Sequence, residues 1–249
     1  MGTTKPVYDV IGADYARHRR PDPRIAAQIE RALGAAATVV NVGAGAGSYE
    51  PTGPAVVAVE PSPVMVAQRL PHGPPVVRAV AEHLPFASDS FAAAMAVLTV
   101  HHWGDPVGGL GEMARVAPRV VVLMFDPAPH FRFWLFDDYV PEVRGLDSSR
   151  TPGAEAVAEV IGADRIEVVP VPADCVDGFI WAFWNRPAAY LDPAVRACTS
   201  GLAQLPSDLV HGRMERLRAD LADGTWHARH GGLMEHDSID GGFRLVVRS

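Results

Sequence analysis

The sequence has few residues that could cross-link the chain or hold a metal. Cys175 and Cys198 are its only cysteines, and they form neither a CxxC pair nor another metal-type spacing. A disulfide framework and a zinc site are therefore not indicated. Three histidines gather near the end of the sequence without a tight ligand pattern, so we predict no metal site; they are His227, His230 and His236.

Positive charge is also scarce. Lys and Arg together number 22 against 29 acidic residues, which gives a formal net charge of −7. The only dense basic cluster lies at residues 17–20. Because nucleic-acid-binding domains usually carry a strongly basic face, we expect no nucleic-acid partner.

Long apolar runs are missing as well. The sequence contains no uncharged apolar stretch of about 18 residues, the length that a membrane span requires. The opening segment, "MGTTKPVYDV", lacks the apolar core of a signal peptide. We therefore expect a soluble, cytoplasmic protein with no membrane partner, and the sequence leaves its oligomeric state open.

The sequence instead contains valine-rich runs that alternate with helical stretches. Runs that are apolar on both faces are typical of parallel strands buried on both sides of a sheet. We therefore predict an α/β fold with a doubly wound sheet, in which ligands bind at the carboxyl ends of the strands. Strands are expected over 38–42, 55–62, 75–82, 91–100, 119–126 and 241–247, and helices over 7–18, 24–33, 64–70, 105–116 and 208–222.

A glycine-rich turn, "GAGAG", follows the first of these strands. Its glycines are Gly43, Gly45 and Gly47, and Ser48 takes the place of the third glycine of a dinucleotide-binding turn. A flexible linker and a turn that serves only the fold are the alternatives, although a linker would be more polar. Glu60 ends the next strand, where a carboxylate can accept two hydrogen bonds from a ribose diol. The pattern favours a nucleoside site.

Five motifs follow one another along the first half of the chain: "VVNVGAGAG", "VAVEPSPVM", "AVAEHLPFASDSF", "LTVHHW" and "GEMARV". In this order and spacing they resemble the motifs of the class I S-adenosylmethionine-dependent methyltransferases, in particular small-molecule methyltransferases with "AExLPF" and "HHW" motifs. The resemblance covers about residues 8 to 126. It implies a Rossmann-like fold, S-adenosyl-L-methionine as cofactor, and methyl transfer to a small-molecule acceptor.

The resemblance also implies how the chain is divided. We expect a single methyltransferase domain, 1–249, in which residues 8–126 form the cofactor-binding core. Residues 127–240, rich in proline and aromatic side chains, would form an elaborated lid that binds the acceptor. Residues 241–247 would add a closing strand.

The resemblance implies cofactor contacts for a set of matching positions. The three glycines would pass under the methionine part of the cofactor, and Glu60, followed by Pro61, would hold the ribose hydroxyls. The other positions are Met65 against the adenine, Ala81 and Glu82 at its edge, Leu98 and Thr99 beside the sulfonium, and Tyr15 and Arg19 over the carboxylate. Structural roles are the alternatives: Met65 as helix core, Glu82 as a solvated cap, and the last pair as surface residues.

Three positions depart from the family pattern. Asn41 stands where many members have Asp, Val80 replaces the Asp before the "AE" pair, and Ala92 replaces the Asp of "DSFD". These departures bear on the detailed cofactor contacts more than on the cofactor itself.

Fewer sequence features point to the acceptor and to the residues that act on it. Methyl transfer from a sulfonium is a direct displacement that depends on alignment, and His101 or His102 could also take a proton from the nucleophile. Structural histidines are the alternative, and Asp126 is a weaker candidate base. Several aromatic residues are candidates to contact a hydrophobic or aromatic acceptor, or else to form core; they are Trp103, Phe133, Trp134 and Trp181.

Two other functions are compatible with a nucleoside site. An NAD-dependent oxidoreductase would need the glycine that Ser48 replaces, so this function is disfavoured. A non-catalytic regulator that binds S-adenosylmethionine would keep the same glycines and Glu60, and the sequence leaves this alternative open.

Overall fold

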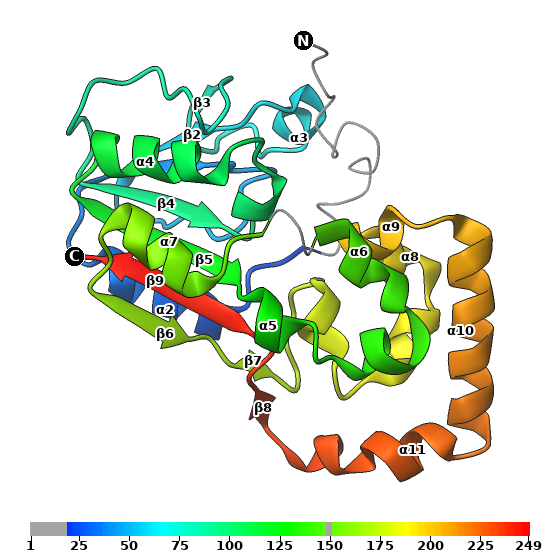
Figure 1. The fold of residues 1–249 in the computed structure, drawn as a ribbon. Helices are drawn as coiled ribbons and strands as arrows, with labels where there is room; N and C mark the ends of the chain where they lie inside the picture. The colour runs from blue at the N-terminus through cyan, green and yellow to red at the C-terminus, as the bar shows by residue number, and fades with distance from the viewer. Residues whose placement is uncertain (1–18, 148–150) are drawn as a thin grey trace.

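The centre of the molecule is a seven-stranded sheet. The computed structural model describes residues 19–147 and 151–249, so the helix expected over 7–18 lies outside the described residues. The strand order is β3-β2-β1-β4-β5-β9-β6 (Figure 1). The first five of these run parallel, and β9 is antiparallel to both of its neighbours. The strands are β1 (Thr38–Val42), β2 (Ala55–Val59), β3 (Val76–Val77), β4 (Ala93–Val97), β5 (Arg119–Phe125), β6 (Arg165–Val168) and β9 (Phe243–Arg248).

Helices cover both faces of this sheet. Successive strand residues point to opposite faces, and Val121 and Val122 of β5 accordingly belong to two different hydrophobic clusters. Helix α2 (Pro23–Leu33) covers one face, while α4 (Pro106–Val116) and α7 (Ala154–Ile161) cover the other. The predicted doubly wound, Rossmann-like α/β fold is therefore confirmed, and the two covered faces explain why the strands are apolar throughout.

The helix boundaries follow local capping chemistry. Asp22 caps α2 by accepting a hydrogen bond from the Arg24 backbone N–H, and Pro occupies the first turn. Ser62 caps α3 (Pro63–Ala67) in the same way, and α3 is shorter than the predicted helix 64–70. The strand predicted over 75–82 is also too long, since only β3 pairs with β2. Ala81 instead packs beside the Trp103 ring.

Part of the predicted acceptor elaboration belongs to the sheet. Helix α7 packs on α4, and β6 forms the sheet edge beyond β9. Neither element was predicted from the sequence. For β6 the reason is that "RIEV" is short and mixes apolar with charged residues. The remaining segments, 127–147 and 169–240, lie outside the seven-stranded sheet.

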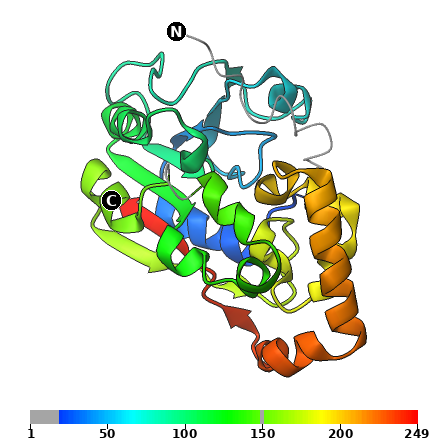
Figure 2. The same cartoon turned by 45° about the vertical axis from the view of Figure 1, so that its right-hand side comes forward.

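These segments form a mostly helical region. In Figure 1 it lies on the right, beyond the tip of the β4 arrow, and Figure 2 shows α10 and α11 along its outer edge. One hydrophobic core runs from the α2 face of the sheet into this region, so the two are packed as one body. The helices are α5 (Pro127–His130), α6 (Arg144–Asp147), α8 (Pro193–Ala197), α9 (Ser200–Ala203), α10 (Ser207–Ala222) and α11 (Thr225–His230), with a small sheet of β7 (Val171–Pro172) and β8 (Ser238–Ile239).

Candidate functional site

The glycine turn has a backbone that only glycine tolerates well. Gly43, Gly45 and Gly47 have φ of 68°, 53° and 97°, in the left-handed region where side chains are disfavoured. A Cβ on Gly43 would lie 2.2 Å from Thr99 Oγ1, so the turn is also packed closely against the chain after β4. The Gly43 N–H donates to the Val59 carbonyl at 2.9 Å. The turn is thus fixed at the carboxyl ends of β1, β2 and β4.

Glu60 is held by backbone donors next to this turn. One carboxylate oxygen accepts from the Gly45 N–H at 2.8 Å, and the other accepts from the Ser62 N–H at 2.9 Å. The side chain is buried. The backbone therefore orients the carboxylate at the end of β2, the position predicted to meet a ribose diol.

An ion pair that was not predicted from the sequence supports the glycine turn. Arg69 donates to the Gly45 carbonyl at 3.1 Å and pairs with the Glu50 carboxylate at 2.7 Å. The Asn41 amide donates to the same carboxylate at 3.1 Å. An aspartate at position 41 would set a second negative charge against Glu50, which accounts for Asn41 where many family members have Asp.

Of the other predicted cofactor positions, Met65 and Thr99 lie against the glycine turn. Met65 is buried, and its methyl group is 3.3 Å from the position of a Cβ on Gly45. The Glu82 carboxylate accepts from the Asp105 N–H at 2.9 Å, ahead of α4. Ala81 is buried, the Pro61 carbonyl accepts from Arg78, Leu98 and Thr99 follow β4, and Tyr15 lies outside the described residues. Their contacts with a cofactor stay predictions.

Arg19 binds a carboxylate of the protein itself. Its Nε and Nη2 donate to the two oxygens of Asp177 at 2.7 and 3.3 Å. Asp177 is buried, and it also accepts a hydrogen bond from the Tyr49 hydroxyl at 2.9 Å. Arg19 borders the cavity described next. Its predicted contact with the cofactor carboxylate stays a prediction.

A cavity lies at the carboxyl ends of β4 and β5, between the sheet and the helical region. Its empty space, including the open mouth, is about 580 Å³. Leu98 lines it, and the next residue, Thr99, lies against Gly43, so the cavity adjoins the glycine turn. Five phenylalanines dominate its wall, together with two histidines; they are Phe125, Phe131, Phe136, Phe179, Phe243, His101 and His130.

The two histidines predicted as bases occupy a short turn after β4. His101 lines the cavity, and its ring lies 3.8 Å from the His102 ring and 4.8 Å from that of Phe125, measured between centroids. Burial lowers the pKa of His101 well below its usual value and that of His102 to about 4. Both imidazoles are therefore neutral near pH 7.

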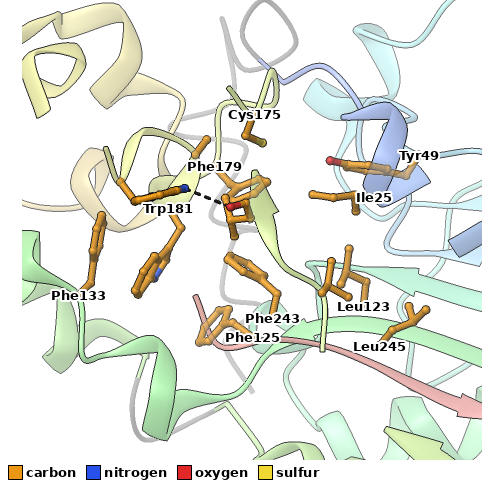
Figure 3. Close-up of a cluster of buried hydrophobic side chains, with 14 of the residues drawn as sticks. Ile25, Tyr49, Leu123, Phe125, Phe133, Cys175, Phe179, Trp181, Phe243 and Leu245 are labelled. Carbon is orange, nitrogen blue, oxygen red and sulfur yellow. Dashed lines mark hydrogen bonds between the residues drawn. The ribbon is translucent and has the colours of Figure 1, made fainter. Parts of the chain in front are cut away.

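The four aromatic residues predicted to contact the acceptor are not among the residues that line this cavity. Trp103 packs on α4, where a Cβ on Gly109 would lie 2.6 Å from its ring. Phe133 stacks on Trp181 at 4.1 Å between centroids, beside Phe125, Phe179 and Phe243 (Figure 3). The Trp134 indole donates to the Trp184 carbonyl at 2.8 Å.

The predicted contacts of these four residues with an acceptor stay predictions, and the aromatic side chains that line the cavity are their neighbours in sequence. Phe131 and Phe136 flank the predicted pair in "FRFWLFDDY", and Phe179 precedes Trp181 by two positions. No periodic signal separates the two sets, because these segments form short irregular turns.

Neither a metal-binding cluster nor a membrane-spanning helix occurs in the part of the chain that the structure describes. Within residues 19–147 and 151–249, no group of three or more His, Cys, Asp or Glu side chains is arranged to hold a metal ion. Among the helices of the same ranges, none combines the length and apolarity that crossing a membrane requires.

Comparisons with known proteins agree with this arrangement. A family described as a methyltransferase domain matches residues 40–124. A candidate methyltransferase from an antibiotic biosynthesis pathway of Anabaena variabilis is 32% identical, with a TM-score of 0.84 over 93% of this chain and 99% of that one. No curated protein matches the sequence.

More distant structures share the fold alone. A candidate methyltransferase from Bacillus halodurans is 15% identical, with a TM-score of 0.53 over 89% of this chain and 96% of that one. Geranyl diphosphate C-methyltransferase from Streptomyces coelicolor, solved with S-adenosyl-L-homocysteine, is 14% identical, with a TM-score of 0.51 over 90% and 78% of the respective chains.

Proposed function

Because the chain belongs to the class I S-adenosylmethionine-dependent methyltransferases, we propose that it transfers a methyl group from S-adenosylmethionine to a small organic acceptor with an apolar, aromatic body. The observation that carries the acceptor class is the phenylalanine-lined cavity beside the glycine turn. Ligand pockets of this kind are mostly apolar, with a few polar groups that fix orientation.

The geometry of the turn supports the cofactor half of the proposal. The positive φ values of Gly43, Gly45 and Gly47 allow the tight turn that ends β1 beside Glu60 and Thr99. The carboxylate of Glu60, oriented by two backbone donors, is suited to accept hydrogen bonds from a diol. These residues fit the nucleoside and methionine parts of S-adenosylmethionine.

The chain's own contribution to the reaction is alignment and exclusion of water. When bound, the cofactor supplies an electrophilic methyl group on a sulfonium. Leu98 and His101 line the cavity after β4, and Thr99 between them lies against Gly43, so an acceptor in the cavity would approach that methyl group beside these residues. Five phenylalanine rings keep this approach apolar, which favours a single orientation of an aromatic acceptor and keeps water from competing.

The similarity to the Anabaena variabilis protein bears on the class of compound to which the acceptor belongs. That protein is assigned to an antibiotic biosynthesis pathway, and it matches nearly the whole of both chains. We extend from it that the acceptor of this chain is a specialised metabolite rather than a macromolecule.

Calorimetry with S-adenosylhomocysteine and with NAD tests the cofactor. We expect binding of S-adenosylhomocysteine only, and selective binding of NAD instead would overturn the proposal in favour of an oxidoreductase. Turnover is tested by incubating the enzyme with S-adenosylmethionine and a panel of aromatic alcohols and amines, with mass-spectrometric detection of methylated product. Cofactor binding without any product across a broad panel would favour the non-catalytic regulator.

A further inference from the structure

His130 is a buried histidine in the wall of the acceptor cavity. It ends α5, four residues after Asp126, and is only 5% exposed. Its ring stacks on Phe125 at 4.3 Å between centroids and 25° between planes. Phe125 thus lies between the rings of His130 and His101, the other histidine that lines the cavity.

One nitrogen of this ring is fixed by the backbone. His130 Nδ1 lies 3.0 Å from the Gly241 carbonyl oxygen. A carbonyl oxygen can only accept, so Nδ1 carries the proton and the other nitrogen, Nε2, is left as an acceptor. Burial lowers the pKa of His130 to about 3, so the ring is neutral near pH 7.

Two adjacent glycines allow this contact. A Cβ on Gly242 would lie 2.5 Å from the His130 backbone nitrogen, and a Cβ on Gly241 would lie 2.9 Å from the Trp181 ring. Gly242 also has φ of 81°, which favours glycine. The start of the closing strand can therefore approach α5 closely enough to hold the imidazole in one orientation.

The second nitrogen has no partner among the residues that the structure describes. The hydrogen bonds of His130 in these ranges involve Nδ1 and the backbone, and none involves Nε2. In these ranges, the side-chain atoms that are inaccessible to solvent and lack a hydrogen-bond partner do not include Nε2. Nε2 is therefore accessible. Since His130 lines the cavity, this lone pair is open to the cavity.

We propose that Nε2 of His130 is the hydrogen-bond acceptor for a hydroxyl group on the aromatic acceptor, so that the preferred substrates are neutral hydroxyarenes. The inference rests on the proposed function for the meaning of the cavity. A neutral imidazole accepts from O–H, and an ionised carboxylic acid has no proton to offer.

A binding cycle with 2-naphthol and naphthalene tests the contact directly. Affinities of both compounds are measured by fluorescence for the wild type, His130→Asn and His130→Phe, in the presence of S-adenosylhomocysteine. The ratio of the two affinities isolates the hydroxyl group. We expect the preference for 2-naphthol to fall about five- to tenfold in both variants, the usual effect of one buried hydrogen bond. His211→Asn, exposed on α10, is the matched control and should change nothing.

The two variants separate the roles of the ring. Asparagine retains a donor that can reach the Gly241 carbonyl but has no equivalent of Nε2, whereas phenylalanine retains the stacking on Phe125. If His130→Phe does not fold, His130→Asn still completes the cycle. An unchanged ratio in a folded variant overturns the proposal, as does failure of the wild type to bind either compound.

Binding of S-adenosylhomocysteine to the same samples keeps the two proposals distinct. We expect it to be equal in the wild type and the His130 variants, because His130 lies away from the glycine turn. If the wild type does not bind S-adenosylhomocysteine, the proposed function fails, and the cycle is then run without it. If it binds and the ratio is unchanged, only the role of His130 fails.

Discussion

Replacing Asp177 by alanine should destabilise the protein strongly. Its carboxylate pairs with Arg19 at 2.7 Å, accepts from the Tyr49 hydroxyl at 2.9 Å and accepts from the Gly178 N–H at 2.7 Å. The two side chains of the ion pair are 9% and 0% exposed. Removing one partner of a buried ion pair costs about 3–5 kcal/mol, because the other charge stays buried.

Tyr49 adds to this cost. It follows the glycine turn with φ of 62°, a conformation that is unfavourable for a residue with a side chain. Its hydroxyl is held by Asp177 on one side and by the Asp22 N–H on the other. Loss of the carboxylate therefore releases a strained residue next to the predicted cofactor site, so we expect weaker binding of S-adenosylhomocysteine as well.

Urea unfolding followed by circular dichroism measures the effect on stability. Asp174→Ala is the matched control. Asp174 lies three residues before Asp177 in the sequence and pairs with Arg24, but its side chain is 81% exposed. Exposed pairs contribute up to about 1 kcal/mol. We expect a loss of about 3–5 kcal/mol for Asp177→Ala and a much smaller loss for the control, because solvent screens the exposed pair. Equal, small losses in the two variants would refute the inference that this buried network joins the glycine turn to the helical region.

Three further predictions concern the two sites. Gly43→Ala should lower the free energy of unfolding by about 2–4 kcal/mol, since its Cβ would meet Thr99 and its φ is 68°; in the same unfolding assay Gly111→Ala, with open space around it, should be neutral or stabilising. Glu60→Gln should weaken S-adenosylhomocysteine binding in calorimetry about 10- to 100-fold, the worth of hydrogen bonds to a charged group; retained wild-type affinity would exclude Glu60 from the site. Burial lowers the pKa of His130 to about 3 in the native state, whereas in the unfolded chain the histidine has its ordinary pKa of 6.5. Below pH 6.5 the unfolded chain therefore binds a proton at this residue that the native state does not bind. Stability should therefore fall as pH decreases from 6.5 toward 3, and His130→Phe should lose about 2 kcal/mol less than the wild type between pH 6.5 and 5; parallel pH profiles would contradict this.

The part of the fold that the sequence predicts is the part with strong local signals. Uniformly apolar runs bounded by glycine and proline predicted β1, β2, β4 and β5 to within a few residues. Edge elements carry no such signal: β3 is two residues long, and β6 is half-buried, so its register with β9 depends on tertiary pairing. The same limit explains why α7 was missed, although its Gly162 at the C-terminus has the left-handed conformation typical of helix ends.

The candidate site also has a part that local sequence signals predict and a part that they do not. The glycine turn and Glu60 were predicted because backbone conformation and strand-end position constrain residue type locally. The brace formed by Glu50 and Arg69 was not, since neither residue lies in a recognisable motif. It depends on a contact between residues 19 positions apart, which no local pattern encodes.

The cavity wall depends on tertiary packing, so the sequence singled out His101, whose role as a base stays a prediction, but not His130. His101 adjoins a strand that the cofactor site also uses, so its position follows from the predicted sheet. His130 reaches the cavity only because the closing strand, more than 100 residues later, brings Gly241 to within 3.0 Å of its ring. A side chain at position 241 or 242 would push Trp181 or α5 away and turn the imidazole. The orientation of the His130 ring in the cavity wall therefore depends on two glycines that do not line the cavity themselves.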